Sequence, residues 1–316
     1  YVKYNDMEKR IEYIDALRGF TMLLVVYSHV RLYGLYVDDS NIVSSFNSIF
    51  LLIRMPLFFF ISGFLFYKKH WDKTSFLNFL KKKAKIQILP ALIFMFIYAY
   101  IFNYDFIAKL FDCYKLGYWF TFTLFSFFIA YFIFNYFISK FRFSDNIKDI
   151  IALLTAILLH FATTNMCMEF LGLYGNISQI LGIIMFKYYI FFTLGTLTKK
   201  HFQTFIKKTD SNLLLTTLVI LFFIPLIPIL KYNLPSINVW IKHITFIYFG
   251  IIGTYLVFIY FNKYKNYFTK ENCIGKIFQF IGKRTLDIYL LHFFFIPRNL
   301  KWLNHYFPDF QNPCIE

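Results

Sequence analysis

Charged residues are scarce in this chain, and cysteine is scarcer still. Asp, Glu, Lys and Arg make up 16% of the 316 residues, and only four residues are Cys. With a mean hydropathy of +0.54, so little charge excludes a soluble globular domain. The cysteines show no C-x-x-C or metal-ligand spacing, so we expect no metal site, although a disulfide among the three in predicted outer loops stays open. Those three are Cys113, Cys167 and Cys314, and the fourth is Cys273.

Other signals are missing as well. No positively charged segment with a cleavage site precedes the first hydrophobic run, so we expect no signal peptide. The chain shows no internal repeat and no loop long enough for a second domain, which predicts one membrane domain over residues 1–316. The net charge of +16 does not indicate nucleic acid as a partner, because Lys and Arg cluster between hydrophobic runs on alternate loops, as membrane topology requires.

Apolar and aromatic side chains are abundant instead: 59% of the residues are hydrophobic and 24% are Phe, Tyr or Trp. Nine hydrophobic runs are each long enough to cross a hydrocarbon core of about 30 Å as a helix. We therefore predict an all-α polytopic transmembrane helix bundle with nine spans in the lipid bilayer. The runs cover residues 14–34, 46–67, 86–104, 118–138, 149–167, 178–198, 212–230, 241–261 and 285–303.

The loops between these runs set the orientation. Most Lys and Arg residues lie before the first run and in every second loop after it. By the positive-inside rule, the N-terminus is cytoplasmic, the protein is integral to the cytoplasmic (inner) membrane, and the ninth span ends outside. Within one inner loop, 68–85, lysines alternate with Trp71, Phe76, Leu77, Phe79 and Leu80, which predicts a helix in the membrane interface that binds lipid or a cytoplasmic polyanion.

The proline pattern makes one further prediction. Three prolines cluster near the outer end of the seventh run, where we expect them to kink or end the helix. They are Pro225, Pro228 and Pro235.

The first run, IEYIDALRGFTMLLVVYSHV, contains two residues that are costly in a membrane. The step from Arg18 to His29 turns a helix through about 1,100°, three turns plus roughly 20°, so both side chains lie on one face, about 16 Å apart along the axis. Asp15 precedes Arg18 by three residues and can pair with it. Because such residues inside a span usually serve a site, we predict that Arg18 and His29 open into one shared tunnel.

Three motifs, taken in this order, resemble the membrane-bound acyltransferase-3 family. The first is Asp15-x-x-Arg18 followed by His29. The second is a Pro-x-Phe-Phe run leading to Ser-Gly: Pro56, Phe58, Phe59, Ser62 and Gly63. The third opens the last run with Gly282, Lys283, Thr285, Tyr289, Leu290 and His292. Family members usually have Ser at the position of Thr285, arginines at those of Lys82 and Lys85, and ten spans, so we expect a tenth helix after Glu316.

The resemblance implies an acyl-CoA-dependent O-acyltransferase without a bound cofactor. An acyl group, most simply acetyl, passes from cytoplasmic acyl-CoA to a hydroxyl of an extracytoplasmic polysaccharide or glycolipid. His29 acts as general base or carries the acyl group itself. Arg18 holds a phosphate or the thioester carbonyl of the donor, and Asp15 fixes the guanidinium. The predicted catalytic residues are thus His29, Arg18 and Asp15.

Further polar residues are candidates for substrate binding. Counted from the nearest charged helix end, Arg54, His160 and Lys187 reach a depth near that of His29. Arg54 is placed to stabilise an oxyanion, and the structural alternative for each is an ion pair or a packing role. His292 lies about 12 Å inside the inner edge, on the donor side. The predicted set is Arg54, His160, Lys187, Glu169 as a sugar ligand, Tyr289 and His292.

A second class of function stays open from sequence. Mid-membrane His, Arg and Lys also mark transporters, so the alternative is a transporter or flippase for an anionic solute or a lipid-linked glycan. The chain lacks an inverted repeat and paired broken helices in matching halves, which favours the enzyme.

Overall fold

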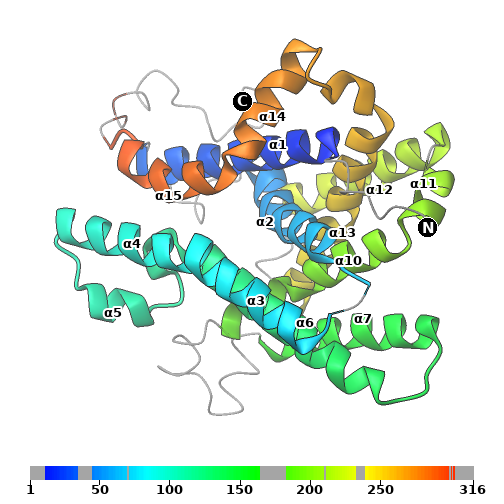
Figure 1. The fold of residues 1–316 in the computed structure, drawn as a ribbon. Coiled ribbons are helices and arrows are strands. Elements are labelled where there is room, and N and C mark those ends of the chain that lie inside the picture. The colour runs from blue at the N-terminus through cyan, green and yellow to red at the C-terminus, as the bar shows by residue number, and fades with distance from the viewer. Residues whose placement is uncertain are drawn as a thin grey trace.

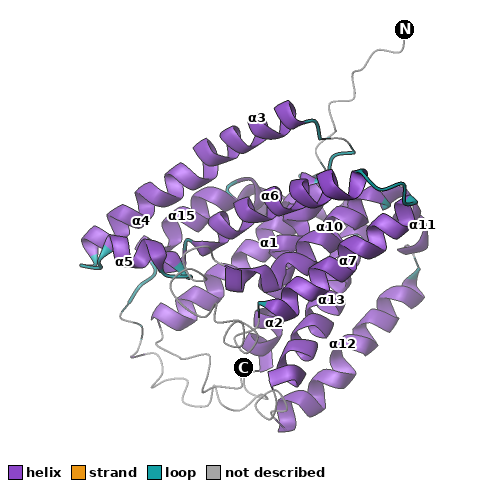
Figure 2. Cartoon of the chain, turned by 90° about the horizontal axis from the view of Figure 1, so that it is seen from below, coloured by secondary structure: helices purple, strands orange, loops and turns teal. Residues whose placement is uncertain are grey.

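The computed structural model describes residues 11–34, 45–69, 71–163, 183–209, 211–232, 239–298, 300 and 302. Every regular element in these ranges is a helix (Figures 1 and 2), so the all-α prediction is confirmed for them. In chain order they are α1 (Glu12–His29), η1 (Val30–Gly34), α2 (Ser45–Phe66), α3 (Lys73–Lys83), η2 (Ala84–Ile88), α4 (Leu89–Ile101), α5 (Phe106–Phe111), η3 (Lys115–Gly117), α6 (Trp119–Ser139), α7 (Asp145–Ala162), η4 (Ile183–Tyr188), α10 (Tyr189–Lys200), α11 (Phe202–Thr209), α12 (Asn212–Tyr232), α13 (Val239–Lys263), η6 (Lys265–Phe268), α14 (Cys273–Lys283) and α15 (Thr285–Phe295).

Four helical stretches of the described residues are long and apolar enough to cross a membrane, judged by length and composition. They are Ile49–Phe66, Lys73–Ile101, Trp119–Ser139 and Trp240–Lys263. Shorter apolar stretches occupy Asn212–Pro228 and Thr285–Phe295. The chain is thus an integral membrane protein by its apolar helices, while nine crossings stay a prediction.

Prolines affect two of the predicted helices differently. α15 ends at Phe295, well short of the predicted residue 303, because Pro297 forces the residue before it into an extended conformation. Ile296 indeed has φ −66° and ψ 118°. By contrast, α12 continues through Pro225 and Pro228, which do not end it. Pro235 lies outside the described residues.

The lysine-rich segment is helical as predicted and continues into the next helix, while its place in the membrane interface stays a prediction. α3, η2 and α4 form one continuous rod of 29 residues, which begins where the Asp72 carboxylate accepts the Ser75 N–H at 2.9 Å. Figure 2 shows this rod and α12 at opposite edges of the bundle. Phe76 is 3% exposed and stacks on Phe132 of α6 with a ring separation of 4.0 Å. The aromatic side chains of this segment therefore pack inside the protein, on the face of the rod that points inward. The lysines lie between them in the sequence.

Two close helix crossings fix the positions of the motif residues. α14 crosses α1 so closely that a Cβ at Gly282 would lie 1.7 Å from the Asp15 carbonyl oxygen. α2 meets α10 in the same way, and a Cβ at Gly63 would lie 2.0 Å from the Phe192 carbonyl oxygen. Glycine is required at both points because backbone meets backbone there. The first crossing brings the start of α15 next to α1, where Thr285 accepts a hydrogen bond from Arg18.

Candidate active site

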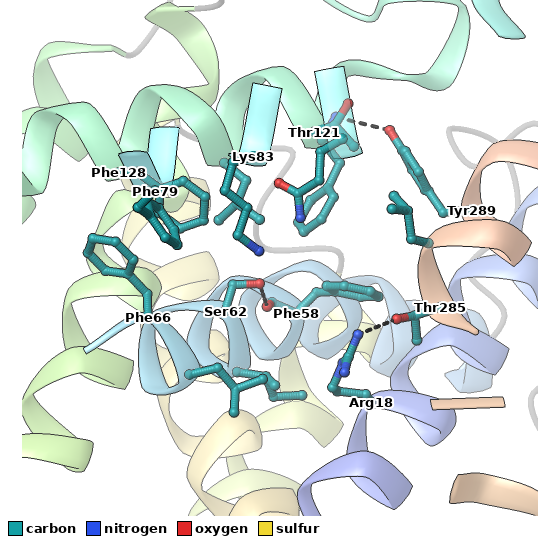
Figure 3. A pocket seen from close by; sticks show the side chains of 16 residues that line it. Arg18, Phe58, Ser62, Phe66, Phe79, Lys83, Thr121, Phe128, Thr285 and Tyr289 are labelled. Carbon is teal, nitrogen blue, oxygen red and sulfur yellow. Dashed lines mark hydrogen bonds between the residues drawn. The ribbon is translucent and has the colours of Figure 1, made fainter. Parts of the chain in front are cut away.

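The first cavity, called here the Arg18 cavity, has a volume of about 220 Å³ and is lined from α1, α2, α3, η2, α6 and α15. Arg18 borders it from α1 (Figure 3). Its Nη2 donates to Thr285 Oγ1 at 2.6 Å, and its Nη1 lies 3.6 Å from Oδ1 of the buried Asp15. Contacts from two helices thus fix the direction of this guanidinium.

Two further residues line the Arg18 cavity: Lys83, one of the lysines in 68–85 that were expected to bind lipid or a polyanion, and Gln87, which sequence reasoning missed. Lys83 extends from α3 into the space that Arg18 and Ser62 border from the other side (Figure 3). Arg18 and Lys83 are the charged side chains among the described residues that line the cavity. Phe79, Lys83 and Gln87 are spaced four residues apart, which places them on one face of a helix. This spacing is the sequence signal that could have indicated that Lys83 and Gln87 lie together. A cavity with two cations and no lining acid suits an anionic ligand.

The second cavity, called here the His29 cavity, has a volume of about 280 Å³. His29 lines it from the end of α1, and the π-helical segment η1 begins at the next residue. Such π-helical segments occur often at functional sites. Arg54 contributes from α2 and Lys187 from η4, while Tyr114 lines it from the loop before η3. An imidazole and two cations therefore border one hollow.

His29 and His292 form a direct hydrogen bond. His29 Nδ1 lies 2.7 Å from His292 Nε2, and the two ring planes differ by 12°. His292 Nδ1 lies 3.0 Å from the Ile288 carbonyl oxygen and 2.9 Å from that of Tyr289. Because carbonyl oxygens only accept, Nδ1 of His292 carries its proton and Nε2 accepts from His29 Nδ1–H. In neutral His29, the proton is therefore on Nδ1 and Nε2 carries none.

The turn before α6 has an unusual backbone, and α15 holds it in place. Lys115, Leu116 and Gly117 have φ angles of 46°, 53° and 95°, a left-handed conformation that costs non-glycine residues about 1–3 kcal/mol each. Tyr289 of α15 donates to the Gly117 carbonyl oxygen at 2.9 Å and accepts the Phe120 N–H at 3.2 Å. These bonds offset part of the strain and keep Gly117 at the wall of the His29 cavity.

Comparison with known proteins agrees with this arrangement. A family model described as an acyltransferase domain matches residues 11–315. The chain belongs to the membrane acyltransferase-3 family. No curated protein and no solved structure matches it.

The three acyltransferase motifs are distant in the sequence but lie close together in the structure. Thr285 and His292 of the third motif contact Arg18 and His29 of the first, and Phe58 of the second lies between them. Phe58, Phe120 and Tyr289 line both cavities, so Arg18 and His29 border two neighbouring hollows that share these side chains, and one continuous tunnel through both stays a prediction.

The remaining predicted residues of this acyltransferase fall into four groups. Arg54 and Lys187 line the His29 cavity. His160 lines neither cavity: it is fully buried, and its Nδ1 lies 2.7 Å from the Lys187 carbonyl oxygen, so it supports the backbone of η4. His292 was expected near the donor but contacts His29, because α15 starts beside Arg18 and runs along α1. Glu169 lies outside the described residues.

The cysteines can be followed in part. Cys113 and Cys273 are free thiols, and Cys167 and Cys314 lie outside the described ranges.

Proposed function

We propose that this membrane acyltransferase transfers an acyl group, acetyl in the simplest case, from cytoplasmic acyl-CoA to a hydroxyl of an extracytoplasmic polysaccharide or glycolipid. The observation that carries the proposal is the hydrogen bond from His29 Nδ1–H to His292 Nε2. It leaves the other nitrogen of His29 unprotonated in a cavity bordered by Arg54, which is what a general base for a hydroxyl needs.

In the proposed reaction, His29 Nε2 takes the proton of the acceptor hydroxyl while its oxygen attacks the thioester carbonyl. The carbonyl oxygen becomes an anion, which the Arg54 guanidinium stabilises. When the intermediate collapses, the carbon–sulfur bond breaks, the new ester leaves, and the CoA thiolate takes the proton from His29. A route through acyl-His29 uses the same lone pair and remains the alternative.

The donor is proposed to occupy the Arg18 cavity. Coenzyme A carries several phosphates, and Arg18 and Lys83 supply positive charge without a competing acid in the lining. The distribution of basic loops supports a cytoplasmic opening for this side and an N-terminus in the cytoplasm. Tyr114, from a predicted outer loop, lines the other cavity, which supports entry of the acceptor from outside.

Proteoliposomes test the proposal directly. Purified protein is reconstituted, labelled acetyl-CoA is added outside, and host-cell polysaccharide stripped of its esters with mild base is enclosed. We expect labelled ester on the enclosed polysaccharide and a fall of about 10²–10⁴-fold for His29→Ala, the range that general bases contribute. Thermal unfolding in detergent checks that the variant is folded. Undiminished transfer by His29→Ala contradicts the mechanism, and label that crosses without ester formation identifies a transporter.

A further inference from the structure

Three rings in contact lie where the two cavities adjoin. Phe58 meets Phe120 with ring centroids 4.8 Å apart, and Phe120 meets Tyr289 at 5.8 Å. All three line both the Arg18 cavity and the His29 cavity. These side chains, called here the partition, occupy the position that an acyl group must pass if its donor is held at Arg18 and its acceptor is activated at His29.

The partition is not equally fixed along its length. Tyr289 is 6% exposed and is tied through its hydroxyl to the backbone of Gly117 and Phe120. The Phe120 ring is 8% exposed and also packs on Phe59 at 4.8 Å. Both rings are therefore held by neighbours on several sides.

Phe58 is the exception. It is only half-buried, and unlike Tyr289 it has no polar atom to hold its ring. It follows Pro56, which lies inside α2 and removes one hydrogen bond of that helix at this level. A rotation of this one side chain moves a ring from between the cavities without disturbing the bonds of Tyr289.

From this difference in how firmly the three rings are held, we infer that Phe58 is the side chain of the partition that moves and the residue that sets the length of the acyl group transferred. The inference rests on the proposed function. In the position observed, the Phe58 ring lines both cavities, and in this inference it narrows the passage between them. Rotated, it admits a thioester bearing a short acyl chain to His29, while each added methylene meets the Phe58 ring, whose rotation is limited by the fixed rings of Phe120 and Tyr289.

The experiment compares acetyl-CoA with butyryl-CoA in proteoliposomes that enclose ester-free host polysaccharide. Release of the CoA thiol gives kcat/KM for each donor. We expect wild type to prefer acetyl, and we expect the butyryl-to-acetyl ratio of Phe58→Ala to rise by at least about tenfold, since one methylene in an apolar site is worth about 10–200-fold. Phe58→Trp lowers the rate with both donors.

Phe79→Ala is the matched control, because it removes another phenyl ring from the lining of the Arg18 cavity and leaves the three rings of the partition in place. It leaves the ratio unchanged. We expect Phe58→Leu to raise the butyryl-to-acetyl ratio by a smaller factor. This variant replaces Phe58→Ala in the experiment if Phe58→Ala fails to fold. A ratio within about twofold of wild type for folded Phe58→Ala, or an equal shift in Phe79→Ala, overturns the role of Phe58. Absence of thiol release by wild type with either donor refutes the proposed function instead.

Discussion

The hydrogen bond between His29 and His292 makes the sharpest prediction. Replacing His292 with Phe keeps a planar ring in the core but removes the acceptor for His29 Nδ1–H. His29 then loses the contact that selects its tautomer, and its Nδ1–H is left without a partner unless the proton moves to Nε2. In that tautomer the base has no lone pair toward the acceptor hydroxyl.

The magnitude follows from the cost of an unsatisfied buried donor. That cost is about 1–3 kcal/mol, so the reactive tautomer becomes about 5- to 150-fold less favourable and kcat falls by the same factor. KM for acetyl-CoA changes little, because Arg18 and Thr285 are untouched. The assay is transfer of labelled acetyl in proteoliposomes, with kcat and KM measured separately.

Two controls distinguish tautomer selection from simple packing. His292→Gln offers an amide oxygen where Nε2 was, so we expect it to recover much of the lost rate. In a His29→Ala background, His292→Phe has no further effect, because the two residues act as one unit. Wild-type kcat in folded His292→Phe, or equal losses in the Phe and Gln variants, refutes the reasoning.

Three further changes test the surroundings. Thr285→Val removes the hydroxyl that accepts from Arg18 and raises KM for acetyl-CoA about tenfold, while Thr285→Ser leaves it near wild type. Lys83→Met keeps the stem but removes one charge of the Arg18 cavity and raises the same KM, whereas Lys82→Met, at an exposed position outside that cavity, does not. Gly282→Ala forces α14 away from α1 and lowers the free energy of unfolding by about 1–3 kcal/mol, seen as a fall in Tm in detergent.

Each of these has a clear contrary outcome. Equal KM values for the Val and Ser variants at residue 285 would mean that Arg18 is held without the hydroxyl. Equal effects at residues 82 and 83 would assign the lysines to the membrane surface. An unchanged Tm for Gly282→Ala would show that the crossing of α1 and α14 is looser than described.

Much of the helical architecture follows from local chemistry. Runs of apolar residues predict the bounds of the helices to within a few residues in α1, α2, α6, α12 and α13. Errors arise where a proline or a group of charged residues interrupts the run. Pro297 ends α15 early, and the alternating lysines hide that α3 continues into α4. The signal for the first was present in the sequence, because the residue before a proline disfavours the helical conformation.

Some members of the candidate site were predictable from the sequence, but its connections were not. Helical periodicity correctly places Arg18 and His29 on a face of α1 that borders cavities, since that rule concerns one helix. It does not tell which of several lysines in 81–85 faces inward. Nor does it show that His160 supports η4 rather than lining a cavity.

By itself, the sequence determined that the chain is an all-helical membrane protein and which family motifs it carries, because apolar length and residue spacing are local properties. The tertiary structure decided that His292 pairs with His29 across 263 positions, that Thr285 holds Arg18, and that Phe58 stands between two hollows. Such contacts depend on which helix faces meet. That is settled by glycine crossings and ring packing between distant segments, which no periodicity within one segment encodes.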